Sequence, residues 1–153
     1  MTQDVATLVA LLSAFGSLLA ALYARWQALS AKRSIQIALH GDRLAVYKSL
    51  IRFRAQISAR GCGIKAEDAW GFGEMAELSE FYYPPAIHLR LDSVFERALK
   101  LLALNDDWEM EKGLNPDTAN ELNRQRHKLM QETRDDCFAI SRDIKSYLRV
   151  GEV

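Results

Sequence analysis

The chain has 153 residues and a formal net charge of zero, with 20 basic and 20 acidic side chains. Its two cysteines, Cys62 and Cys137, are too few for a disulfide framework, and we expect two reduced thiols, with a single disulfide as the alternative. The charge is unevenly divided. Residues 1–60 carry eight basic and two acidic side chains. Residues 61–153 carry the other twelve basic and eighteen acidic side chains. Such an asymmetry indicates a surface interaction by the basic half.

Residues 5–24 contain no charged side chain. A helix of that length is about 30 Å long, which matches the hydrocarbon core of a bilayer. A secretory signal is the first alternative, but the segment before the run is acidic at Asp4 and no clean cleavage site follows. A buried core helix is the second, but the run is long and has no amphipathic face. We therefore expect a transmembrane helix.

The flanking charges predict an orientation for this span. No basic residue precedes it, whereas basic residues follow it closely, so the positive-inside rule places the N-terminus outside and the rest in the cytoplasm. The predicted location is a bacterial inner membrane. Aromatic and basic side chains beyond the span are expected to anchor it at the inner leaflet: Tyr23, Arg25, Trp26, Lys32 and Arg33.

Small side chains recur within the predicted span at alternating spacings of four and three residues. They are Ala6, Ala10, Ser13, Ser17, Ala20 and Ala24. The spacing continues beyond the span through Gln27, Ala31, Ser34, Ala38, Gly41 and Ala45. A stripe of small residues lets helix backbones approach closely in lipid, and a seven-residue period suits a left-handed helix pair. The stripe predicts self-association, although alanine and serine are also simply common in membrane helices.

Residues 25–60 lack proline and contain one glycine, which predicts a long helix leaving the membrane. A wide apolar face begins at Leu44 and comprises Leu44, Val46, Tyr47, Leu50, Ile51, Phe53 and Ile57. Basic residues occupy much of the remainder. We interpret them as a solvated or lipid-facing surface rather than a nucleic-acid surface, because no reading motif or stacking aromatic accompanies them.

Four breaks are expected in the rest of the chain. Residues 61–63 should end the long helix, and Gly71 and Gly73 should separate a short turn from a short helix at 74–81. A helix should then run from the two prolines at 84–85 to about Leu104, with residues 105–113 forming a polar connection. The last helix should begin at residues 115–117, because Asn115 is a good N-cap, and run to about Leu148 with Arg126 interrupting its apolar face.

The sequence therefore predicts an all-α protein in which an N-terminal transmembrane helix continues into a cytoplasmic helical bundle. We expect a transmembrane anchor at residues 1–26, a juxtamembrane helix at 27–60 that joins the bundle, and the remainder of the bundle at 61–153. The bundle should contain three main helices and one short one.

No pattern typical of an enzyme is present. His40, His88 and His127 are isolated, and no HExxH, GxSxG or phosphate-binding glycine motif occurs. Adjacent acids at 106–107 and 135–136 point about 100° apart on a helix and rarely converge on one ion. We expect no catalytic residue, cofactor, metal or small-molecule substrate.

Residues 43–53 read RLAVYKSLIRF, and residues 81–87 read FYYPPAI. Together they resemble the RLxVYxxLxxF and aromatic-Pro-Ile segments of small uncharacterised bacterial membrane-anchored proteins. This chain departs from the pattern at Pro85 and Ala86, where that group tends to have an acid. The resemblance implies a membrane helix followed by a cytoplasmic helical domain, and it implies no activity.

These observations predict a non-enzymatic, single-pass membrane protein whose bundle self-assembles or binds a protein partner. Besides membrane lipid, the expected partner is a second copy or another protein, and no nucleic acid. The alternative is a membrane-perturbing effector, by analogy with effectors of bacterial defence loci.

Overall fold

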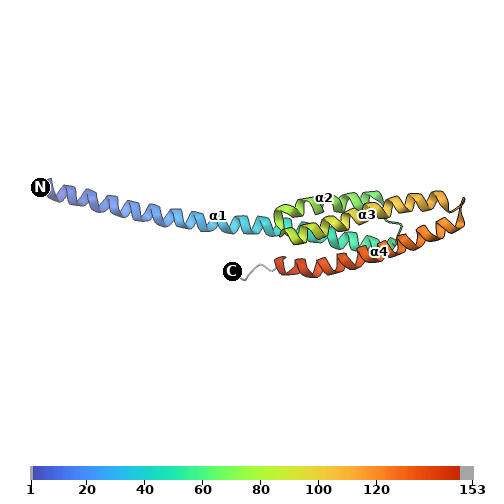
Figure 1. The fold of residues 1–153 in the computed structure, drawn as a ribbon. Coiled ribbons are helices and arrows are strands. Elements are labelled where there is room, and N and C mark those ends of the chain that lie inside the picture. Colours follow the sequence, from blue (N-terminus) through green and yellow to red (C-terminus); the bar gives the residue numbers. More distant parts are fainter. Residues whose placement is uncertain (1, 149–153) are drawn as a thin grey trace. The chain divides into compact units, whose positions relative to one another are not determined.

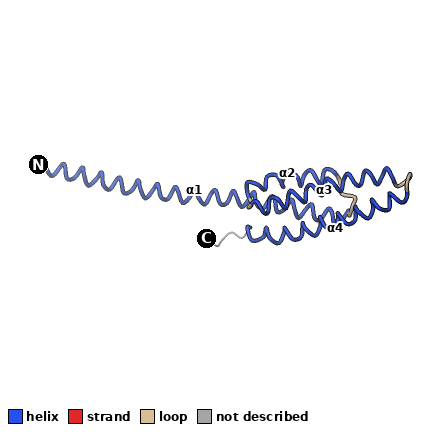
Figure 2. Tube along the Cα trace, viewed as in Figure 1, coloured by secondary structure: helices blue, strands red, loops and turns tan. Residues whose placement is uncertain are grey.

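A computed structural model describes the backbone of residues 2–148 and the side chains of residues 15–148. Four α-helices and a final 3-10 turn follow one another along the chain (Figure 1). They are α1 (Thr2–Arg60), α2 (Ala66–Tyr82), α3 (Pro85–Glu111), α4 (Pro116–Ile144) and η1 (Lys145–Leu148). No strand occurs among the described residues, as Figure 2 also shows. The predicted all-α class is confirmed.

The chain divides into two compact units, residues 1–39 and residues 40–153. The first unit is helical throughout its described backbone and belongs to α1. Every residue from 15 to 38 is exposed. No helix among the described residues has a stretch long and apolar enough to cross a membrane. The predicted span at 5–24 lies partly outside the residues whose side chains are described, since these begin at 15.

The second unit is a bundle built from the last part of α1 together with α2, α3 and α4 (Figure 1). Helix α3 packs against both α2 and α4. The last part of α1 contributes apolar side chains at helical spacing, namely Val46, Leu50, Phe53 and Ile57, all of them buried. The rings of Phe53 and Phe72 are stacked, with centroids 4.7 Å apart and planes inclined by 7°. The apolar face predicted from Leu44 onward therefore supplies one wall of the core.

Three predicted helix boundaries are confirmed. Helix α1 ends at Arg60, and Gly61 follows with a positive φ of 60°, a conformation that glycine adopts without steric cost. Proline stands at the first position of α3, where its missing N–H costs no hydrogen bond. At α4, the side-chain oxygen of Asn115 accepts a hydrogen bond from the backbone N–H of Thr118, as an N-cap does.

The predicted break at Gly71 and Gly73 is wrong, because α2 runs through both glycines for 17 residues. Gly73 is buried, and a Cβ built there would lie within 2.9 Å of three ring carbons of Phe95. The glycine is therefore a packing residue that admits an aromatic ring from α3. The second unit consequently contains four well-formed helical segments rather than three with one short helix.

The predicted end of the third helix near Leu104 is also wrong, because α3 continues to Glu111. Asn105 is held by tertiary hydrogen bonds. Its Nδ2 donates to the carbonyl oxygen of Cys62 at 2.5 Å, and its Oδ1 accepts from Nε of Arg126 at 2.7 Å. These bonds use the polar side chain inside the bundle, so Asn105 does not end the helix.

Candidate functional surfaces

All positions of the predicted small-residue stripe fall within α1. The side chains of Ala6, Ala10 and Ser13 lie outside the described residues. Ser17, Ala20 and Ala24 are exposed, and so are the later members from Gln27 to Ala45. The described members of the stripe therefore lie on the surface of the chain.

The predicted anchoring residues are also exposed on α1, namely Tyr23, Arg25, Trp26, Lys32 and Arg33. The rings of Tyr23 and Trp26 are 6.1 Å apart and tilted by 30°, so the two aromatics form one local cluster. Between residues 15 and 38 the large exposed apolar side chains also include Phe15, Leu18, Leu19, Leu22, Leu29, Ile35 and Ile37. An exposed apolar surface of this extent marks an interaction site.

Within the bundle, one exposed side of α1 carries two of the basic residues that the sequence analysis interprets as a solvated or lipid-facing surface. We call it the α1 outer face, and it consists of the exposed residues Ala45, Lys48, Arg52, Ala55 and Ala59. Among the described residues, neither Lys48 nor Arg52 has an ion-pair partner. The residues of this face follow Ala45 at alternating steps of three and four, the same register as the small-residue stripe, but its next two positions are the basic residues Lys48 and Arg52.

A second uncovered surface lies on α2. We call it the α2 outer face, and it consists of Trp70, Glu74, Glu77, Leu78 and Phe81, all exposed. Trp70 is 57% exposed and Phe81 is 73% exposed, which is unusual for such large apolar side chains on a folded bundle. Among the described residues, Glu74 and Glu77 have no ion-pair partner. Helix α2 contains five acidic side chains and no basic one, so this face is both apolar and negatively charged.

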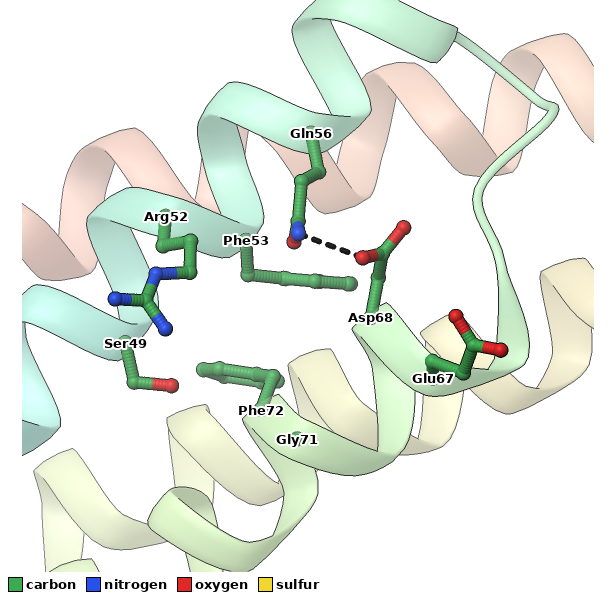
Figure 3. A pocket seen from close by; sticks show the side chains of 8 residues that line it. All are labelled: Ser49, Arg52, Phe53, Gln56, Glu67, Asp68, Gly71 and Phe72. Atoms are coloured by element: carbon green, nitrogen blue, oxygen red, sulfur yellow. Dashed lines mark hydrogen bonds between the residues drawn. The ribbon is translucent and has the colours of Figure 1, made fainter.

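A shallow groove of about 210 Å³ lies between α1 and α2 (Figure 3). Phe53 and Phe72 lie stacked beside it. Of the two acids that line it, Asp68 already has partners on its own chain. One of its carboxylate oxygens accepts a hydrogen bond from Nε2 of Gln56 at 2.6 Å, and the other forms an ion pair with Arg60. The groove is also lined by Ser49, Arg52, Glu67 and Gly71.

The histidines and acids considered in the sequence stay dispersed. Among the described residues, no group of three or more histidine, cysteine or acidic side chains could hold a metal ion. Nδ1 of His88 lies 3.0 Å from Oγ of Ser79, a local contact between α3 and α2. Asp136 pairs with Arg97 at 2.5 Å and Asp135 pairs with Arg134 at 3.3 Å. Asp135 and Asp136 therefore form separate ion pairs.

Among the described residues, three groups have a shifted pKa, and burial is the main cause for each. It raises the pKa of the Cys62 thiol, an effect that the nearby positive charge of Arg126 opposes. It raises the pKa of Tyr83 to about 12 and that of Cys137 to about 12. Burial in apolar surroundings therefore disfavours the thiolate form of both cysteines.

Arg126, predicted as an interruption of the apolar face of the last helix, is 8% exposed. Its guanidinium lies over the Trp108 ring at 4.2 Å, and Nε donates to Asn105. One of its terminal nitrogens is buried and has no hydrogen-bond partner among the described residues. The residue joins α4 to α3 and, through Asn105, to the turn at Cys62.

Comparison of the chain with protein-family models, curated proteins and solved structures finds no match. The resemblance to small bacterial membrane-anchored proteins thus stays a prediction. The candidate surfaces are defined by their own chemistry: two exposed stretches of α1 and one exposed face of α2.

Proposed function

We propose that this chain is a non-enzymatic, single-pass inner-membrane protein whose helical bundle mediates self-assembly or binding to a protein partner. In this proposal residues 5–24 span the bilayer, the N-terminus lies outside, and the bundle lies in the cytoplasm. Lipid and a second protein chain are the two kinds of partner that it requires.

The observation that carries the proposal is the exposure of every residue from 15 to 38 of α1. A single helix without tertiary contacts gains little stability in water, and most helices are held by packing of an apolar face. Here the large apolar side chains between Phe15 and Ile37 have no such packing. Ile37, for example, is 73% exposed. Lipid around the uncharged run at 5–24 and protein around the later residues supply the missing cover.

Membrane insertion is tested by placing charge in the uncharged run of the full-length chain. We expect the double variant Phe15→Arg, Leu18→Arg to move from the membrane pellet to the supernatant after fractionation. Each arginine near the centre of a span costs about 2.5–3.5 kcal/mol. The matched control is Ile37→Arg, which adds a charge to the same exposed helix outside the run and should stay in the pellet. Retention of the double variant in an alkali-washed pellet would refute the membrane span.

Self-assembly is tested separately on the wild-type chain in a mild detergent. We expect a mass that corresponds to more than one copy per micelle, measured by light scattering or native mass spectrometry. A monomer at every concentration up to about 100 μM, in detergent and in lipid vesicles alike, would remove self-assembly and leave partner binding.

A further inference from the structure

The α1 outer face and the α2 outer face are complementary in charge. Lys48 and Arg52 have no acidic partner on their own chain among the described residues, and Glu74 and Glu77 have no basic one. Opposite charges across an interface fix the register of two partners and increase the rate at which they meet. All four charged residues are exposed when the chain is alone, and Arg52 also lines the groove between α1 and α2 of its own chain.

The two faces are also complementary in size. Trp70, Leu78 and Phe81 project from α2, whereas the neighbours of the two basic residues on α1 are alanines. Large side chains of one helix that pack over small side chains of another allow close approach of the backbones. The uncovered α2 face therefore fits the kind of surface that α1 presents.

The register of these groups along the bundle can be read from contacts within one copy. Nε of Arg43 donates to the carbonyl oxygen of Tyr82 at 2.9 Å, so these residues lie at one level. Phe53 stacks on Phe72, and Gln56 bonds Asp68, at successive levels in the opposite direction along α2. Helix α2 thus runs antiparallel to this part of α1.

Interpolation between these contacts assigns each residue of the α2 outer face a level on α1, to within about one residue. Glu77 is level with Lys48, and Glu74 is level with Arg52. Trp70 is level with Ala55, and Phe81 is level with Ala45. In two copies held side by side at the same height, the acidic side chains of one copy therefore face the basic side chains of the other. The large apolar side chains face alanines.

We infer that the α2 outer face of one copy docks on the α1 outer face of a second copy of this chain. The contact joins two different surfaces, so each copy keeps one free face, and the contacts extend into a ring or a row. The inference rests on the proposed self-assembly, and shared anchoring in one membrane supplies the equal height. The docking specifies which two surfaces meet and which charged side chains pair between the copies.

Charge reversal in the full-length chain tests the docking. We expect the variant Lys48→Glu, Arg52→Glu to lose assembly by about tenfold or more in detergent at low salt, because its two faces are both acidic. The variant Glu74→Lys, Glu77→Lys should lose assembly to a similar degree, because its two faces are both basic. The control Lys100→Glu, Lys128→Glu changes the net charge equally at exposed positions away from both faces and should assemble like the wild type.

Restoration distinguishes a charge pair from misfolding. A mixture of the two reversed variants should assemble again, because each supplies the face that the other lacks, and so should the chain that carries all four substitutions. If the reversed variants keep the wild-type mass, the docking is wrong while self-assembly stands. A monomeric wild type overturns both. Loss of assembly in the reversed variants without restoration in the mixture overturns the pairing of these faces.

Discussion

The ring of Phe95 occupies the space that a side chain at Gly73 would need. Gly73 lies on α2 and Phe95 on α3, so the missing Cβ lets the two helices approach closely. Trp70 meets the same ring edge-on, with centroids 5.5 Å apart and planes inclined by 67°. A glycine that the local pattern marks as a helix break is thus a close contact between two helices.

Substitution of this glycine should therefore destabilise the protein despite a gain in helix propensity. We expect Gly73→Ala to lower the free energy of unfolding by about 1–3 kcal/mol, because the new methyl group forces Phe95 to move. Gly71→Ala is the matched control on the same helix, where a Cβ meets open space. It should raise stability by about 0.5–1 kcal/mol. Urea denaturation followed by circular dichroism measures both, and equal effects at the two glycines would contradict the packing role.

The polar link from Cys62 through Asn105 to Arg126 should be a second point of stability. We expect Asn105→Ala to cost about 2–3 kcal/mol, because it removes two hydrogen bonds and leaves the carbonyl oxygen of Cys62 and Nε of Arg126 without these partners. Asn120→Ala, at an exposed position of α4, should change stability by less than about 0.5 kcal/mol. Denaturant midpoints of the two variants provide the comparison. Similar midpoints would show that the link adds little.

Stability should decrease in alkaline solution, and Cys137 should cause part of the decrease. Burial raises the pKa of its thiol from 9.0 to about 12, so the folded chain keeps a proton that the unfolded chain releases. The contribution is fully present below about pH 9 and is lost as the pH rises toward 12, with a slope of at most about 1.4 kcal/mol per pH unit. Tyr83, whose pKa is raised to about 12, adds to the loss above pH 10.

The variant Cys137→Ala separates this thiol from the other groups. It should be less stable than the wild type by about 1 kcal/mol at pH 7 because a buried group is lost. Its free energy of unfolding should then decrease less steeply between pH 9 and 11. Urea titrations at several pH values check the slope, and parallel curves for variant and wild type would exclude Cys137 as a cause.

The small-residue stripe predicts a different kind of change. Replacing Ala10, Ser13 and Ser17 together by leucine should reduce the population of assembled copies in detergent, because bulky side chains separate helix backbones that pack through small residues. Phe15→Leu is a suitable control, because residue 15 lies on the side of the helix opposite the stripe. The mass of the complex measures the effect, and an unchanged mass would mean that assembly does not use the stripe.

Local patterns predicted the helix ends correctly where backbone chemistry decides them. A left-handed glycine at 61, a proline at 85 and an asparagine cap at 115 each act through their own backbone or the next turn, so the neighbouring residues suffice. The same reasoning failed at Gly73 and Asn105. Both residues are poor helix formers by propensity, and both are kept in helices by partners far away in the sequence.

The candidate surfaces show the same division. The small-residue stripe on α1 was predicted from spacing, because one helix repeats every 3.6 residues, and the anchoring aromatics were predicted from their place at the end of the uncharged run. The α2 outer face could not be found in this way. The apolar residues of α2 lie on all sides of that helix. Only packing against α1 and α3 decides that Phe72 is buried while Trp70 and Phe81 are exposed.

By itself, the sequence determined the helical class, the ends of most helices, and the uncharged run at 5–24, because these depend on composition and on neighbours along the chain. Tertiary structure alone decided which glycine packs against an aromatic ring and which asparagine links three segments. It also decided which acids and bases of the described residues have no ion-pair partner. The physical reason is that packing and ion pairing depend on groups brought together from distant positions. A single helix periodicity contains no information about those groups.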